Sequence, residues 1–138
     1  MLTKIDLQRL SQARMDDALL LLNANRASSA YYLAGYSVEL GLKACIAKPV
    51  QSDTIPDKAF INAIYTHRLD NLVATAGLRP ALDAEVKADS QFAAYWAITS
   101  NWNEESRYQL TDPISSASLL TAIAEPNHGV FRWVKLHW

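Results

Sequence analysis

The chain has 138 residues and a formal net charge of -1, which excludes the overall basic field of a typical nucleic-acid surface and leaves only a local patch for such binding. Half of the residues are hydrophobic, and only four are glycine and five proline. This composition excludes disorder and predicts one all-α domain over residues 1–138. The single cysteine, Cys45, excludes an intrachain disulfide and a cysteine-based zinc site.

We expect a cytoplasmic protein that spans no membrane and carries no metal and no cofactor. The longest apolar runs are interrupted by polar residues before they reach membrane-spanning length. Residues 1–10 lack the uninterrupted apolar core of a signal peptide. A lone cysteine inside an apolar segment fits a reducing compartment.

The first helix is expected to begin at Thr3 and to run to about Asn23. Thr3 and Asp6 have the spacing of a capping box, in which each side chain bonds the backbone of the other residue. Asn23 and Asn25 then predict a tight turn. Because this connection is short, the first two helices should be antiparallel neighbours.

The second helix, residues 26–48, has apolar residues on several sides, as expected of a helix enclosed by others. Pro49 should end it. Gly35 and Gly41 each cost about 1 kcal/mol relative to alanine, which predicts the close approach of another helix, from this chain or from a second subunit. Glu39 and Lys43 lie one turn apart and predict a structural ion pair, our preferred interpretation, or part of a ligand site.

Shorter helices should follow. We expect one over residues 58–64, a third main helix that opens at Thr66 and stops at Gly77, and a fourth main helix over residues 82–100. His67, at the start of the third helix, is interpreted as a capping or core histidine, with a place in a site as the alternative.

A polar connection over residues 101–113 precedes the last helix, which should begin near Ser115 and be interrupted by Pro126 and Gly129. Arg107 and Tyr108 lie in this connection. An arginine beside an aromatic ring can hold a phosphate and stack a base. The equally weighted alternative is a salt bridge from Arg107 to one of three carboxylates, those of Glu104, Glu105 and Asp112.

Three stretches together resemble the HEPN domain (higher eukaryotes and prokaryotes nucleotide-binding). Residues 30–46, AYYLAGYSVELGLKACI, are similar to the second helix of that family, in which small and aromatic residues lead into Glu-x-x-x-Lys, here Glu39 and Lys43. Thr66 and His67 then open a helix, and residues 106–108, Ser-Arg-Tyr, precede the last helical stretch. The resemblance covers most of the chain in order.

The resemblance implies an up-and-down bundle of four main helices plus short helices, usually dimeric. It also implies a setting in toxin-antitoxin or defence systems and a neighbouring nucleotidyltransferase-type partner. Many such domains are metal-independent ribonucleases whose arginine is followed, after four to six residues, by a histidine. Here Asp112, Pro113 and Ile114 stand where the histidine should follow Arg107.

Our preferred hypothesis is therefore a non-catalytic, HEPN-like nucleotide- or RNA-binding or antitoxin-type homodimer, with Arg107, Tyr108, His67 and Lys43 lining its site. The first alternative is a ribonuclease that uses a carboxy-terminal pair with the family spacing, Arg132 as phosphate clamp and His137 as general base. The second is a purely structural dimerisation module, motivated by the two helical glycines and by three aromatic residues near the end of the chain, Phe131, Trp133 and Trp138.

Overall fold

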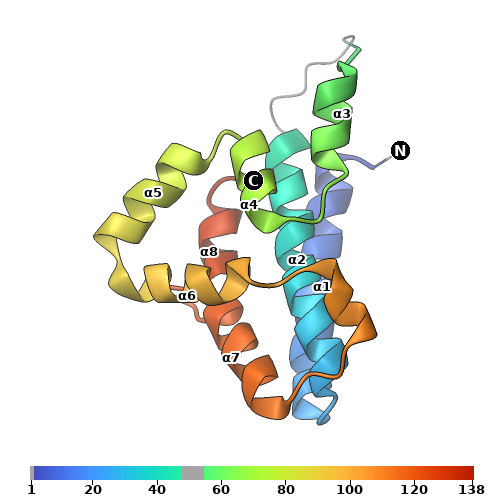
Figure 1. The fold of residues 1–138 in the computed structure, drawn as a ribbon, viewed down its shortest axis with the longest axis vertical. Helices are drawn as coiled ribbons and strands as arrows, with labels where there is room; N and C mark the ends of the chain where they lie inside the picture. The colour runs from blue at the N-terminus through green and yellow to red at the C-terminus, as the bar shows by residue number, and fades with distance from the viewer. Residues whose placement is uncertain (1, 48–54) are drawn as a thin grey trace.

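The computed structural model describes residues 2–47 and 55–138, and in these ranges the chain forms helices and no strand (Figure 1). The expected all-α class is therefore confirmed for the described residues. None of the helices in these ranges has both the length and the apolar character needed to cross a membrane. The elements are α1 (Lys4–Asn23), α2 (Ala27–Ala47), α3 (Lys58–Ile64), α4 (Leu69–Thr75), α5 (Arg79–Ala88), α6 (Ser90–Ser100), the 3-10 helix η1 (Glu104–Tyr108), α7 (Pro113–Ala124) and α8 (Val130–Lys135).

The two long helices, α1 and α2, form an antiparallel pair (Figure 1). The capping box that starts α1 is confirmed: Thr3 Oγ1 accepts the Asp6 backbone N–H at 3.1 Å, and Asp6 Oδ2 accepts the Thr3 N–H at 3.0 Å. The predicted turn is also present, with Asn25 at a φ of 61°, a left-handed conformation that asparagine tolerates better than most residues. These local interactions set the start of α1 and the turn that leads into α2.

Helix α2 is enclosed by α1, α4, η1, α7 and α8, and most of its second half is buried. Gly41 meets the expected neighbouring helices, because an added Cβ would lie 2.8 Å from Val134 Cγ1 on α8 and 3.2 Å from Ser11 Oγ on α1. Gly35 instead seats the indole of Trp102, which a Cβ would overlap. Both glycines are thus explained within one chain. The stop predicted at Pro49 lies outside the described residues.

Two predicted boundaries are wrong. The helix expected over residues 82–100 is two helices, because Asp89 has extended backbone angles, ends α5 and caps α6 by accepting the N–H groups of Gln91 and Phe92. Thr66 does not cap the helix that follows it. Its Oγ1 accepts the Arg68 N–H at 3.2 Å, and α4 begins only at Leu69, after an extended Arg68.

The other short elements lie as expected. Residues 58–64 are helical, Gly77 follows α4 with a φ of 72°, and a turn between α7 and α8 contains Pro126 and Gly129. Helix α7 starts two residues before Ser115, capped by the Asp112 carboxylate. Two of the carboxy-terminal aromatic residues, Phe131 and Trp133, are core residues of α8, so they offer no surface for the structural dimerisation alternative.

Candidate functional site

The structure gathers Lys43 and His67 around the buried carboxylate of Glu39. Glu39 is 1% exposed. Lys43 Nζ donates to Glu39 Oε2 at 3.2 Å, and His67 Nδ1 lies 2.9 Å from Glu39 Oε1. Since both carboxylate oxygens are engaged, the burial of this charge is compensated. His67 reaches α2 because the segment between α3 and α4 crosses it, a contact that its sequence position alone does not reveal.

Arg107 and Tyr108 project from η1 into solvent at the other end of the same α2 face. The Arg107 guanidinium lies 4.9 Å from the centroid of the Tyr108 ring, which is 73% exposed. Within the described residues no ion pair joins Arg107 to a carboxylate. A hydrogen bond to Tyr108, with a smaller contribution from Tyr32, raises the pKa of Arg107. Arg107 is therefore a charged group that no carboxylate neutralises among the described residues.

A cleft of about 340 Å³ opens between η1 and the start of α2, and we call it the Arg107 cleft. This volume lies at the lower end of the range for small-molecule sites. Ser106, in the floor of the cleft, is only 4% exposed, and its Oγ has no hydrogen-bond partner among the described residues. A buried hydroxyl without a partner calls for an explanation, but this Oγ is itself closed to solvent, so it is not a group that the open cleft presents to a ligand. The cleft is lined by Leu21, Ser28, Ser29, Tyr32, Leu33, Ser106, Arg107 and Gln109.

The four residues predicted to bind a ligand therefore fall into two groups on α2. Arg107 stands beside Tyr32, whereas His67 and Lys43 surround Glu39, about 10 Å further along the helix at 1.5 Å per residue. Tyr36 lies between the groups, and its ring stacks on that of Tyr32 at 5.9 Å with an interplanar angle of 4°. Of the predicted residues, Arg107 lines the Arg107 cleft, whereas Tyr108, His67 and Lys43 do not. The cleft residues of α2, Ser28, Ser29 and Tyr32, were not predicted.

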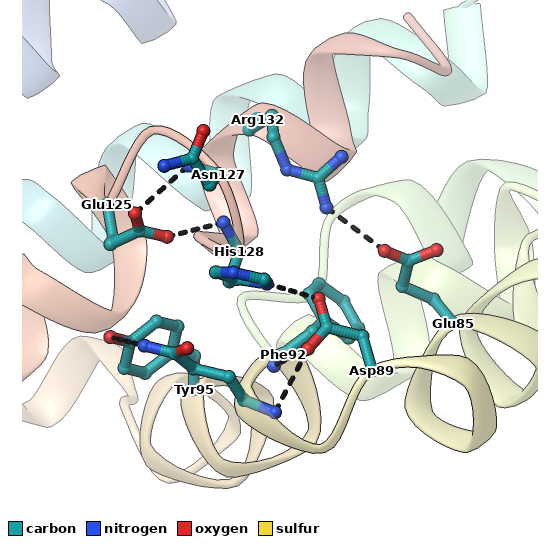
Figure 2. A network of polar contacts seen from close by, with 9 residues as sticks. Glu85, Asp89, Phe92, Tyr95, Glu125, Asn127, His128 and Arg132 are labelled. Carbon is teal, nitrogen blue, oxygen red and sulfur yellow. Dashed lines mark hydrogen bonds and ion pairs between the residues drawn. The ribbon is translucent and has the colours of Figure 1, made fainter.

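The carboxy-terminal pair is engaged elsewhere. Arg132 Nη2 donates to Glu85 Oε1 on α5 at 3.0 Å (Figure 2). The ring of His137 packs against Trp133 with centroids 4.9 Å apart. The Arg132 guanidinium thus already neutralises a carboxylate, which reduces the charge that it can offer to a phosphate.

A polar network that sequence reasoning missed joins the α5–α6 corner to the turn between α7 and α8 (Figure 2). His128 Nδ1 lies 2.6 Å from Asp89 Oδ2, and Glu125 accepts the backbone N–H groups of Asn127 and His128. The hydrogen bond between the side chains raises the pKa of His128 and lowers that of Asp89. Burial raises the pKa of Glu125, but the two backbone N–H groups and His128 outweigh it and leave a lowered pKa.

One sequence signal could have located this corner. Asp89 stands directly before Ser90, Gln91 and Phe92, which is where a helix N-cap is expected. Its partner could not have been found in the same way, because His128 lies 39 residues further along the chain.

No protein-family model, curated protein or solved structure matches the chain. In the two described ranges, no three His, Cys, Asp or Glu side chains gather closely enough to hold a metal ion. The groups of the described residues that could act on a ligand include those of the Arg107 cleft and the ionisable groups around Glu39 and His128.

Proposed function

We propose that this chain is a HEPN-like up-and-down helical domain that binds a nucleotide or RNA without cleaving it and acts as a homodimer. In this proposal the chain acts as an antitoxin-type partner of a neighbouring nucleotidyltransferase-type protein. The resemblance of residues 30–46 and 106–108 to that family motivates the family assignment. The Arg107 cleft is the observation that carries the binding function.

The Arg107 cleft and the Tyr108 ring next to Arg107 together offer complementary groups for a phosphate and a base. Arg107 supplies charge and several N–H donors for a phosphate at the cleft. The exposed Tyr108 ring next to Arg107 provides a flat face for stacking. Phosphate and base would thus be held by neighbouring residues of one 3-10 helix.

Lys43 and His67 would serve a longer ligand. They lie beyond the stacked Tyr32 and Tyr36 rings on the same helix, so a strand that starts in the Arg107 cleft would reach them after passing those rings. Leu110 and Ile114, 98% and 83% exposed beside η1, would carry the contact between two copies.

Equilibrium binding of mononucleotides and short RNA at low salt tests the proposal, with Arg107→Gln as the principal variant. Loss of a charge-assisted hydrogen bond is worth about 1.5–3 kcal/mol, so we expect binding to weaken roughly 10- to 100-fold. Ser106→Ala should change affinity little, because the Ser106 hydroxyl is closed to solvent. Arg9→Gln, an exposed arginine on α1, is the matched control and should leave affinity unchanged.

Three results would contradict the proposal. Absence of binding, or a binding affinity that Arg107→Gln leaves unchanged, would refute the proposed binding site. Cleavage of RNA in the presence of EDTA that is lost in His137→Ala would replace the binding function by the ribonuclease alternative. A strictly monomeric mass at micromolar concentration would remove the homodimer.

A further inference from the structure

His67 places its imidazole ring between a buried carboxylate and solvent. Its Nδ1 lies 2.9 Å from Oε1 of Glu39, which is 1% exposed, whereas 43% of the His67 side chain is exposed. In the part of the chain that the structure describes, its other ring nitrogen, Nε2, makes no hydrogen bond and is not closed to solvent. One nitrogen therefore faces the protein, and the other is open to a ligand.

The contact with Glu39 determines which of the two nitrogens carries the proton. An ionised carboxylate only accepts, so Nδ1 must be the donor, and in the neutral ring Nε2 is then an acceptor. Lys43 Nζ donates to the second oxygen of Glu39 at 3.2 Å, so the buried charge is balanced without a charge on the histidine. His67 thus presents a neutral ring with a fixed hydrogen-bond acceptor toward solvent.

An acceptor at this point discriminates between the groups of a nucleic-acid strand. A strand that starts in the Arg107 cleft passes two stacked tyrosine rings before it reaches His67. Recognition of a particular base needs two matched contacts on its edge, whereas Nε2 offers one. Phosphate oxygens accept hydrogen bonds, so the donor of the sugar–phosphate backbone is the ribose 2'-hydroxyl. Every RNA nucleotide carries that hydroxyl and DNA lacks it.

We propose that His67 Nε2 accepts a hydrogen bond from a ribose 2'-hydroxyl and thereby makes the chain prefer RNA to DNA. This inference rests on the proposed function, because the strand must first be held in the Arg107 cleft. The buried carboxylate strengthens the contact, since a hydrogen bond at Nδ1 polarises the ring and makes Nε2 a better acceptor. It also holds the ring in place, so little conformational freedom is lost on binding.

Two oligonucleotides that differ only in the 2'-hydroxyl test this inference: a short RNA, and the same sequence as DNA with uracil in place of thymine. At constant salt we expect the unaltered protein to bind the RNA about 3- to 10-fold more tightly, as expected for one hydrogen bond between neutral groups. His67→Asn should abolish this difference. The asparagine amide can still donate to Glu39 from the position of Nδ1, so the buried carboxylate keeps its partner, but no acceptor remains at the position of Nε2.

Two further variants separate this inference from the proposed function. Arg107→Gln should weaken the binding of RNA and of DNA by the same factor and leave the ratio of their affinities unchanged. His128→Asn alters another histidine that pairs with a carboxylate, that of Asp89, and should change neither affinity. Replacement of one ribose at a time by deoxyribose should locate the whole difference at a single nucleotide, and this measurement needs only the unaltered protein, even if His67→Asn folds poorly.

Several results would overturn the inference. Equal affinity of the unaltered protein for RNA and DNA would refute it and leave the binding function of the Arg107 cleft standing, whereas no binding of either would refute both. A preference for RNA that survives in His67→Asn would place the discriminating group elsewhere. An effect of His67→Asn that depends on the base at the located nucleotide would make a base edge, and not the ribose, the partner of Nε2.

Discussion

Helix α2 and the α5–α6 corner are held in place by different interactions. The buried residues of α2 are packed against other helices, and its buried charge, Glu39, is neutralised inside that packing. The corner has one buried residue in α5, Leu82, and one near the start of α6, Phe92, and its ion pairs with the rest of the chain are those of Asp89 with His128 and of Glu85 with Arg132. Figure 1 shows α5 as the helix furthest from the α1–α2 pair.

This difference indicates which region of the fold is rigid and which region changes its stability with pH. Close packing of apolar groups changes little with pH, whereas a histidine–carboxylate contact depends on both protonation states. The Arg107 cleft includes residues of α2, so the proposed binding site lies against the packed region. One histidine–carboxylate contact, His67–Glu39, is also on α2, but there it lies among the packed helices, whereas the His128–Asp89 contact lies at the corner.

The largest expected effect comes from truncating one leucine in each region. Leu42 and Leu82 are 0% and 1% exposed, so their burial is matched. We expect Leu42→Ala to lower the free energy of unfolding by about 4 kcal/mol and Leu82→Ala by about 2 kcal/mol, because the peripheral corner can relax into the cavity. Urea unfolding measures both. Equal losses would break the contrast between the two regions.

An intermediate effect is expected at Gly35. Alanine there would overlap the Trp102 ring. Overpacking costs up to about 3 kcal/mol, and the better helix propensity of alanine returns about 1 kcal/mol, so Gly35→Ala should destabilise by about 2 kcal/mol. Gly41→Ala should cost less, since its nearest obstacle is a methyl group of Val134. A neutral Gly35→Ala in urea unfolding would show that Trp102 is not firmly seated.

The smallest effect is a pH dependence at the corner. The pKa of His128 is raised, so its contribution is complete below the unfolded value of 6.5 and is lost as pH rises through the folded pKa. The pKa of Asp89 is lowered, so its contribution is present above 3.8 and is lost as pH falls through the folded pKa. The contact should therefore stabilise most between about pH 4 and 6.5.

His128→Gln should accordingly destabilise the protein more at pH 5.5 than at pH 8.5 in urea unfolding. Glu125 and Arg132 also face His128, so Asp89→Asn and the double variant complete a cycle that isolates the pair. A loss of stability in His128→Gln that is the same at both pH values would show that the corner is held without this charge pair.

Local signals made much of the fold predictable. The capping box at Thr3, the turn at Asn25 and the many-sided apolar pattern of α2 depend on residues close in sequence. The break at Asp89 was missed because helix-forming residues flank it on both sides, which obscured the N-cap signal of the aspartate. Its contact with His128 could not be found locally, because the two residues lie 39 positions apart. Sequence patterns of helical period cannot register such distant contacts.

The site was predictable in part for the same reason. Arg107 and Tyr108 are adjacent, and their contact follows from that adjacency. The pairing of His67 with Glu39 spans 28 residues, and the α2 side of the Arg107 cleft depends on how η1 lies against that helix (Figure 1). These features follow from tertiary packing. Individual residues could therefore be predicted from the sequence, but their arrangement in space could not.

The seat of Trp102 on Gly35 makes the sizes of two distant residues interdependent. No side chain larger than hydrogen fits at position 35 while an indole occupies position 102, and a smaller residue at 102 would leave a void over the glycine. In any chain that keeps this fold, a larger residue at position 35 should therefore be accompanied by a smaller one at position 102. Complementary side-chain volumes at positions 35 and 102 would therefore help to identify distant relatives even where no sequence motif is shared.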